Sequence, residues 1–400
     1  MRPPTRFLGM AAVLLFVAAA GLSAQDTRVT FGGQVRPRME SRAAGEDTRE
    51  TFTSMRVRAQ LQAVLTEDAR VFVQLQDVRL FGEEASTLGD FSANALDLHQ
   101  GYLELGFGTD HPSKLRVGRQ ALALGEQRLI GAVEWTQQGR SFDGARFTAT
   151  SLGSLTLDLF AMKLQEKSSA TWDFDGDFLG AFGTVDLRAA GSLDLYTLLT
   201  RDSREEGTDE HTLGALWKGA AGPVDLRIEG SLQGGERNGA DVSAWMVGAR
   251  AGMAVHEKAT LTLWYDHLSG DDDPDDGEAR VFNTLFATNH AFYGAADYFL
   301  NIPVHTGGLG LRDAALKLAL GPWDGTTLKA DLHAFSTAEE GSLSTRSLAR
   351  ELDLTLTHPM GPGLTAVAGI SFVQARDGIR ELGRLEDDAT WGFLMLNAVF

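Results

Sequence analysis

The 400-residue chain contains no cysteine, which excludes a disulfide scaffold and a zinc site built on thiolates. After the first 24 residues it also lacks any uninterrupted apolar run of ~18 residues, so we expect no helix that spans a bilayer. Basic residues are outnumbered by acidic ones, 36 against 54, and this balance argues against nucleic-acid binding. No Pro/Ser-rich linker marks a domain boundary.

The N-terminus has the pattern of a secretory signal peptide. Arg2 and Arg6 precede an apolar run over residues 7–20, and small residues then lead to Ala24 and a polar segment. We predict cleavage after Ala24, so that residues 1–24 are the signal peptide and residues 25–400 the mature domain. A retained membrane anchor is the alternative, but the apolar run is shorter than the ~20 residues that a spanning helix needs.

Apolar and polar residues alternate with a period of two along the mature chain, which indicates β-strands. In residues 29–40 the apolar side chains take odd positions and the polar ones take even positions. Residues 55–63, 155–159, 224–229 and 351–356 show the same alternation. A soluble β-sandwich alternates in the same way, so this pattern alone does not choose between a sandwich and a membrane barrel.

The connections between the strands favour a membrane barrel, because short and long ones alternate along the chain. Short connections are expected at residues 66–69, 108–113, 151–153, 189–190, 219–222, 256–257, 321–325 and 358–362. Long connections are expected at residues 81–96, 123–141, 165–177, 268–307 and 375–389. We therefore predict an all-β, transmembrane antiparallel β-barrel of eighteen strands with short periplasmic turns and long extracellular loops. Sixteen strands is the alternative, since residues 281–286 and 292–300 fit either strand or loop.

The C-terminus agrees with a membrane barrel. Residues 390–399 have the pattern of a final strand, and the chain ends in the aromatic Phe400. A terminal aromatic residue after a closing strand is the usual assembly signal of bacterial outer-membrane barrels. Together with the signal peptide, it predicts location in the bacterial outer membrane, with membrane lipid and lipopolysaccharide around the barrel.

The inward polar side chains are then expected to carry the function, since a barrel of this size encloses an aqueous lumen unless loops fill it. Residues 26–150 carry 15 basic and 17 acidic side chains, whereas residues 151–400 carry 19 and 37. Six arginines of the first part lie at polar strand positions: Arg36, Arg38, Arg56, Arg58, Arg116 and Arg146. One interpretation is a lumen sector that attracts carboxylates or phosphates. In the other, opposed charges only satisfy each other inside a wet barrel.

No metal, cofactor or catalytic site is predicted. The acidic loop at residues 271–278 departs from the EF-hand pattern, with Asp276 at its sixth position and Phe282 at its twelfth. We interpret it as a solvated outer loop. The motifs Gly-x-Ser-x-Gly, His-Glu-x-x-His and Gly-x-Gly-x-x-Gly are absent from the sequence, and we do not expect an enzyme.

Two segments of the chain resemble the alginate-export family of outer-membrane proteins. The first runs from Leu115 to Arg146 and contains Arg-Val-Gly-Arg-Gln and Gly-Arg-Ser-Phe-Asp-Gly. The second, residues 288–299, contains Asn-His-Ala-Phe-Tyr-Gly. The resemblance spans residues 29–400. It implies an eighteen-stranded barrel for passive passage of an anionic exopolysaccharide through an electropositive constriction, with a periplasmic export partner.

The resemblance also implies roles for individual residues. The pore-lining candidates in the matching motifs are Arg116, Arg119, Arg128, Arg140 and Arg146. Asn289, His290 and Tyr293 are expected to fold the long loop that contains them. The alternative role of the arginines is to stiffen a hairpin and a folded loop.

One departure from the family bears on the cargo. The C-terminal part of this chain is acidic, whereas dedicated alginate exporters are strongly basic channels. A general or substrate-selective porin for small solutes is therefore the first alternative function. A barrel whose loops bind a partner or a surface glycan without conducting is the second, and a secreted soluble β-sandwich is the third.

Overall fold

The computed structural model describes residues 27–45, 48–83, 96–108, 112–167 and 173–400. The signal peptide predicted at residues 1–24 lies outside these ranges and stays a prediction. Within the described ranges, no helix is long and apolar enough to cross a membrane.

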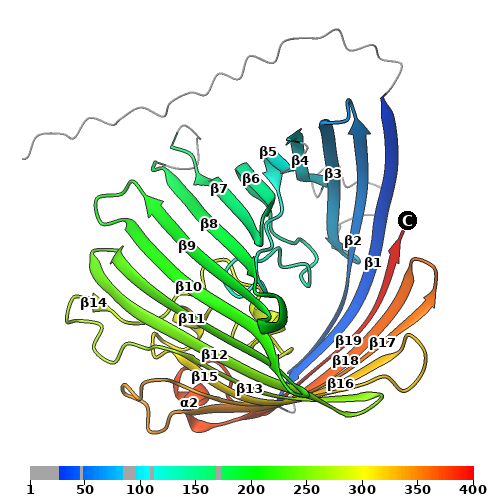
Figure 1. Cartoon of the computed structure of the whole chain (residues 1–400). Coiled ribbons are helices and arrows are strands. Elements are labelled where there is room, and N and C mark those ends of the chain that lie inside the picture. The colour runs from blue at the N-terminus through cyan, green and yellow to red at the C-terminus, as the bar shows by residue number, and fades with distance from the viewer. Residues whose placement is uncertain (1–26, 46–47, 84–95, 109–111, 168–172) are drawn as a thin grey trace, which may run out of the picture.

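Most of the described chain is β-strand, and nineteen strands form a single sheet (Figure 1). The strands are β1 (Arg28–Ala44), β2 (Thr48–Val64), β3 (Ala69–Leu80), β4 (Leu96–Phe107), β5 (Ser113–Gln120), β6 (Phe142–Leu152), β7 (Leu155–Gln165), β8 (Gly176–Asp186), β9 (Ser192–Asp202), β10 (Thr208–Ala221), β11 (Val224–Arg237), β12 (Ala240–His256), β13 (Ala259–Leu268), β14 (Glu278–Ala279), β15 (Leu311–Leu320), β16 (Thr327–Ser336), β17 (Ser347–Gly361), β18 (Leu364–Ala375) and β19 (Ala389–Val399). The helical elements are short: η1 (Arg188–Ala190), η2 (Asn289–Ala291), α1 (Ile302–His305) and α2 (Asp377–Glu381).

The sheet closes on itself. β1 pairs antiparallel with β19, from Gln34 opposite Val399 to Ala44 opposite Ala389. The two-residue β14 runs parallel to β12 inside a loop, so the wall consists of the other eighteen strands. Closure removes the free edges of the sheet, which matters because lipid offers no hydrogen bonds to unpaired backbone groups. The predicted eighteen-stranded antiparallel barrel is confirmed.

The alternative of sixteen strands depended on residues 281–286 and 292–300. Both segments are loop, with only the single turn η2 between them, and the wall still has its eighteen strands. Seven of the eight predicted short turns coincide with short connections at the end of the barrel that holds the start of β1 and the end of β19, the periplasmic end. The eighth, predicted at residues 108–113, lies largely outside the described residues. The predicted topology is therefore right in number and in direction.

The strict alternation of short and long connections is wrong at the outer end. The connections β1–β2, β9–β10 and β11–β12 are short there as well. β12 is 17 residues long, and its hairpin with β11 continues outward until it ends in Asn238-Gly239. Both residues have positive φ, 53° and 84°, as a tight two-residue hairpin turn requires. A long hairpin with a tight turn thus replaces a long loop.

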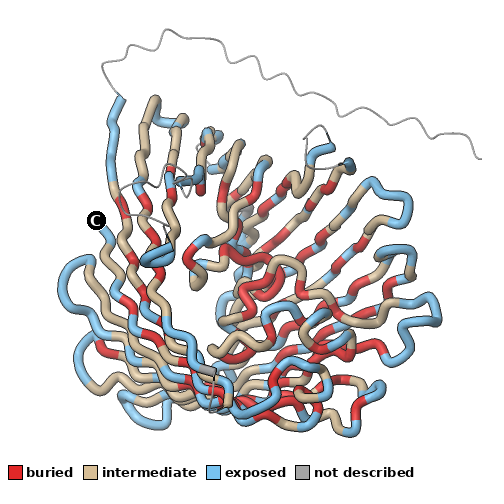
Figure 2. The backbone as a smooth tube through the Cα atoms, turned by 180° about the vertical axis from the view of Figure 1, so that it is seen from behind, coloured by how far each residue is buried: buried red, intermediate tan, exposed pale blue. Residues whose placement is uncertain are grey.

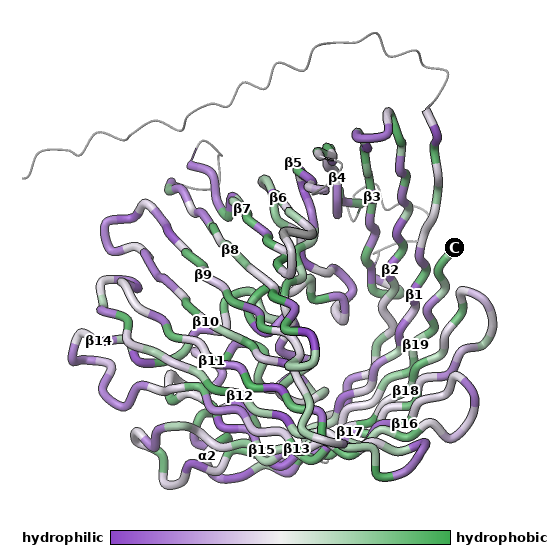
Figure 3. Tube along the Cα trace, viewed as in Figure 1, coloured by the Kyte–Doolittle hydropathy of each residue, from purple (hydrophilic) through white to green (hydrophobic). Residues whose placement is uncertain are grey.

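Burial is inverted relative to a soluble protein, as the alternating pattern predicts. On β1 and β2, Arg36 and Arg56 point inward and are 5% and 1% exposed. Phe31 and Leu232 point outward and are 79% and 64% exposed. Figure 2 shows buried and exposed residues alternating along the strands, and Figure 3 shows the matching alternation of hydropathy. The outward apolar side chains meet lipid, so their exposure carries no hydrophobic penalty.

The C-terminal residue completes the barrel seam. The backbone nitrogen of Phe400 donates to the carbonyl oxygen of Gly33 at 3.1 Å, and the nitrogen of Gly33 donates back at 2.8 Å. A Cβ atom at Gly33 would lie 2.7 Å from Cζ of the Phe400 ring. Glycine at this position therefore leaves room for the terminal ring against β1.

Candidate functional site

Two loops fold into the interior of the barrel, and we call them the inner loop pair: residues 121–141, after β5, and residues 269–310, after β13 (Figure 1). Residues 272–278 of the second loop stay exposed at the outer end. Backbone hydrogen bonds join them. Gly131 donates to the carbonyl oxygen of Phe286 at 2.8 Å, and Phe286 donates to that of Leu129 at 2.9 Å. The two loops therefore fold as one unit although they lie far apart in the sequence.

Apolar packing fixes the inner loop pair to the wall. Leu122 and Phe282 of the loops and Phe178 of β8 are completely buried and belong to one hydrophobic cluster. Inward side chains of β7 and β9, such as Met162 and Leu198, belong to the same cluster. The barrel thus contains a hydrophobic core of its own, which the alternation pattern did not predict.

Arg36 and Arg38, on the inward face of β1, bind the backbone of the first inner loop. Arg36 donates to the carbonyl oxygens of Glu134 and Thr136 at 2.7 and 2.6 Å. Arg38 donates to the carbonyl oxygen of Trp135 at 2.8 Å, and its guanidinium carbon lies 4.5 Å from the centre of that ring. Both side chains are buried beneath the loop, so they anchor it to the wall.

Arg56 and Arg58, on β2, hold the carboxylate of Glu134. Nη1 of Arg58 lies 3.0 and 2.8 Å from its two oxygens, and Nη2 of Arg56 lies 3.0 Å away. Burial raises the pKa of the Glu134 carboxyl, but the neighbouring His99 ring and the charges of Arg58 and Arg56 outweigh burial and lower the pKa to about 2. Glu134 is therefore ionised at neutral pH, and the anchor is an ion-paired one.

Arg128 and Arg140 belong to the first inner loop. Arg128 binds side chains of the wall and of the second inner loop, and Arg140 binds the second inner loop. Arg128 donates to Glu229 at 2.9 Å, to Asp266 at 2.8 and 3.1 Å and to the hydroxyl of Tyr293 at 2.9 Å. Burial alone lowers the pKa of Arg128, but Asp266, Tyr293 and Glu229 together raise it well above its ordinary value. Arg140 donates to backbone carbonyls of the second inner loop. These two predicted pore-lining residues thus tie the loops together.

Arg116 on β5 and Arg146 on β6 face the interior and stay partly exposed. Arg116 donates to Glu104 at 2.8 Å, and Arg146 donates to Asp158 at 2.7 Å. The two arginines are directly opposite each other in the sheet. Of the nine predicted arginines, this pair keeps the position expected of lumen-lining side chains.

Arg119 faces the other way. It stands opposite Asp143 on β6 and pairs with it at 2.7 Å. Val117, two residues earlier on the same face of β5, is 48% exposed to the surroundings of the barrel. Arg119 therefore lies on the outward face, although the motif had suggested the lumen.

Asn289, His290 and Tyr293 all make contacts within the inner loop pair. The side-chain amide of Asn289 donates to a hydroxyl and a backbone carbonyl of its own loop, both at 2.9 Å. The His290 ring stacks on Trp135 with centroids 4.2 Å apart, and its Nδ1 lies 2.6 Å from Asp297. Tyr293 accepts the hydrogen bond from the arginine of the first loop described above. Asn289 thus stabilises its own loop, and His290 and Tyr293 join that loop to the first one.

A cavity of about 350 Å³ opens on the inner wall near the periplasmic turns, and we call it the periplasmic pocket. Arg227 of β11, Arg250 of β12 and Lys317 of β15 line it. The Trp264 ring lies between them, 3.5 Å from the Arg250 guanidinium carbon and 4.2 Å from the Lys317 nitrogen. The carboxylate of Glu126, from the first inner loop, accepts hydrogen bonds from Arg227 at 2.6 Å and from Arg250.

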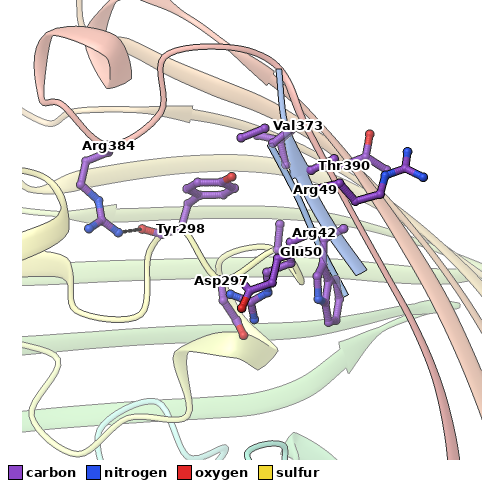
Figure 4. A pocket seen from close by; sticks show the side chains of 13 residues that line it. Arg42, Arg49, Glu50, Asp297, Tyr298, Val373, Arg384 and Thr390 are labelled. Atoms are coloured by element: carbon purple, nitrogen blue, oxygen red, sulfur yellow. Dashed lines mark hydrogen bonds between the residues drawn. The ribbon is translucent and has the colours of Figure 1, made fainter. Parts of the chain in front are cut away.

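A second cavity, of about 650 Å³, lies at the outer ends of β1 and β19, and we call it the outer pocket (Figure 4). Arg42, Arg384, Tyr298 and Trp391 line it together with the acidic Asp297. Arg384 donates to the backbone carbonyl of Tyr298 at 3.1 Å, which fixes this part of the second inner loop. The two pockets thus lie at opposite ends of the inner loop pair, and each combines cations with aromatic rings.

The residues of the periplasmic pocket were missing from the candidates chosen by sequence. Arg227 and Lys317 stand at polar positions between apolar neighbours, in Leu-Arg-Ile and Leu-Lys-Leu, so the alternation marks them as inward. The acidic balance of residues 151–400 gives no indication of a cationic site in that part of the chain. Position in the alternation would have been a better guide than regional charge.

A comparison with protein families completes the assignment. The model of the alginate export family matches residues 27–381. This chain belongs to the alginate export family. A comparison with curated proteins gave no match.

Solved structures of outer-membrane proteins share the fold of this alginate export family member. OpdL of Pseudomonas aeruginosa has a TM-score of 0.67 and 13% identity, over 94% of this chain and 99% of OpdL. OccAB4 of Acinetobacter baumannii has a TM-score of 0.63 and 11% identity, over 94% of this chain and 100% of OccAB4. The outer membrane protein OpdK of P. aeruginosa has a TM-score of 0.60 and 12% identity, over 93% and 98% of the two chains. At these low identities the structural similarity shows the fold alone. Family and fold together place this chain in the bacterial outer membrane as a channel.

Proposed function

We propose that this channel allows passive passage of an anionic polysaccharide, or of another anionic solute, across the outer membrane. The observation that carries the proposal is the pair of pockets, each lined by cationic and aromatic side chains, at the two ends of the inner loop pair. A periplasmic export partner, which the family resemblance implies, belongs to the same proposal. Catalysis does not.

The periplasmic pocket has the chemistry that a uronate residue requires. Guanidinium groups bind carboxylates through charge-assisted hydrogen bonds, and Arg227 and Arg250 already bind one, that of Glu126. The Glu126 carboxylate stands where the carboxylate of a ligand would bind. Trp264 supplies an apolar ring beside these charges, which suits the apolar face of a sugar ring. A passing polyuronate would compete with Glu126 for the two arginines.

The outer pocket repeats the combination at the other end of the interior. Arg42 and Arg384 supply charge, while Tyr298 and Trp391 supply aromatic surface. A polymer that carries a carboxylate on each sugar can exchange one such site for the next along its length. Conduction needs sites of this kind, which attract the permeant without holding it. Arg116 and Arg146, inward and partly exposed, offer guanidinium groups on the wall of the other side, where they pair with Glu104 and Asp158.

One observation favours the second candidate, a porin for small solutes. The inner loop pair packs by a hydrophobic core against the wall, so a wide polymer has to displace packed side chains, whereas a small solute does not. Most inner cations are also paired, as Lys317 is with Asp331 at 3.2 Å. Both features suit a narrow route for small anions.

Single-channel conductance in planar bilayers separates the two candidates. The refolded barrel is placed under a salt gradient, and oligo-uronates of increasing length are added to one side. Neutral oligo-glucoses of matched length serve as the control. Anion-selective current that uronates block and neutral sugars do not supports polysaccharide passage. Anion current without block by uronates supports the small-solute porin, and the absence of current would contradict both.

A further inference from the structure

An apolar groove of about 480 Å³ lies on the outward face of β6 to β9. Its floor consists of small side chains on three neighbouring strands, Ala145, Ala161 and Ala181. Leu159 and Leu179 beside them are 42% and 37% exposed and rise around the floor. The barrel wall therefore carries a depression in its lipid-facing surface at this place.

A row of charged side chains borders this groove on the side of the outer strand ends. Its members stand opposite one another on successive strands from β5 to β9, alternate in sign, and are Arg119, Asp143, Lys163, Asp177 and Arg201. On β6, β7 and β9 the charged residue lies on the same face as a groove residue and two positions nearer the outer end of the strand. Charge and apolar depression therefore adjoin on one face.

The cations of the row keep hydrogen-bond donors for a further partner. The Lys163 ammonium lies 3.0 and 3.2 Å from Asp177 and Asp175, and these two contacts leave one of its three N–H groups. Arg201 binds Asp209 through Nε and Nη2 at 3.1 and 3.0 Å. Its Nη1 has no hydrogen-bond partner within the part of the chain that the structure describes, and the side chain is 52% exposed. Both donors point to a ligand that carries negative charge at the level of the row.

We propose that this face binds lipopolysaccharide of the outer leaflet, with a lipid A phosphate at Lys163 and Arg201 and an acyl chain in the groove. Three observations select this occupant. The row lies near the outer ends of the strands, the exposed donors are cationic, and the groove directly beside them is apolar. A lipid with a phosphate head and several acyl chains satisfies all three at once. The inference concerns the outside of the wall and does not depend on the proposed passage.

The test is retention of lipid by the folded barrel. The protein is reconstituted with hexa-acylated lipid A, phosphatidylglycerol or phosphatidylethanolamine, and bound lipid is counted by native mass spectrometry. One variant, Ala161→Phe with Ala181→Phe, fills the groove. A second, Lys163→Gln with Arg201→Gln, removes the cations and leaves the residues that line the groove unchanged. Matched controls on the outward faces of β18 and β17 are Ala368→Phe, opposite the exposed Leu394, and Arg350→Gln.

Wild type is expected to retain lipid A in preference to both phospholipids. Each site variant is expected to lower lipid A retention about tenfold or more, because it removes either charge-assisted contacts or the chain site. The controls are expected to retain lipid A as wild type does. If the groove variant fails to fold, as judged by heat-modifiable mobility, the charge variant decides alone. Equal retention in the charge variant and its control, or equal retention of phosphatidylethanolamine and lipid A, would overturn the assignment.

Discussion

Glu126 is the residue whose replacement tests the proposed passage most directly. Its carboxylate neutralises Arg227 and Arg250 at the periplasmic pocket, so the variant Glu126→Gln removes one negative charge and leaves both arginines. Glutamine is similar in size and still offers an oxygen to one guanidinium. The inner loop pair is therefore expected to keep its place, since hydrophobic packing and other hydrogen bonds also hold it.

The size of the effect follows from Coulomb's law. For a passing anion ~7 Å from the lost charge, the repulsion removed in a water-like dielectric is ~0.6 kcal/mol. That energy corresponds to an increase of about threefold in local anion concentration. Salt screening lowers the value and the low-dielectric wall raises it, so about threefold is our expectation for the rise in the anion-to-cation permeability ratio.

The assay is the reversal potential in planar bilayers under a salt gradient, with Glu126→Gln compared with wild type. Glu386→Gln is the matched control, because it removes one acid from an exposed position of the outer loop between β18 and β19. The control is expected to match wild type. A reversal potential of Glu126→Gln that equals wild type, or that moves toward cation selectivity, would refute a role for the periplasmic pocket in the passage.

Three further predictions concern other parts of the molecule. Arg116→Glu combined with Arg146→Glu is expected to lower anion preference, since both side chains face the interior; unchanged ion selectivity would remove them from the passage. Gly33→Val is expected to reduce several-fold the heat-modifiable folded barrel in membranes, because a Cβ at position 33 and the Phe400 ring cannot both fit. Deletion of Phe400 is expected to have the same effect, because it removes the two backbone hydrogen bonds with Gly33 at the seam; normal folded yield would contradict either prediction. The Glu134 carboxyl has its pKa lowered from 4.5 to about 2, so its stabilising effect is complete above pH 4.5 and is lost as pH falls toward 2. The difference in unfolding temperature between wild type and Glu134→Gln should therefore be constant at neutral pH and vanish near pH 2, and a constant difference down to pH 2 would exclude the ion-paired anchor.

The wall of the barrel could be predicted because its determinants are local. Alternation with period two assigns each side chain to a face, and turn residues such as Asn238-Gly239 mark where a hairpin ends. The seven periplasmic turns within the described residues followed from such local signals. The three short outer connections were misjudged for a related reason, since long loops are a tendency of membrane barrels and not a physical requirement.

The interior could not be predicted, because its contacts join residues far apart in the sequence. Arg36 and Arg56 were correctly assigned to the inward face, but nothing near them in the sequence shows that a loop about a hundred residues away folds onto them. Arg119 is different. It follows Arg116 by three positions, and in a strand that spacing places two side chains on opposite faces. Careful use of the period would have assigned it to the outside.

The hydrophobic core inside the barrel has a consequence for anyone who would use this protein as a nanopore. Cutting out the inner loops to widen the bore would leave Phe178, Met162 and Leu198 on the bare lumen wall. Those strands would then expose apolar side chains to lipid on their outer face and to water on their inner face. Such a tube would collapse or capture a stray hydrophobic segment. Widening it requires polar replacements on the wall before any loop is removed.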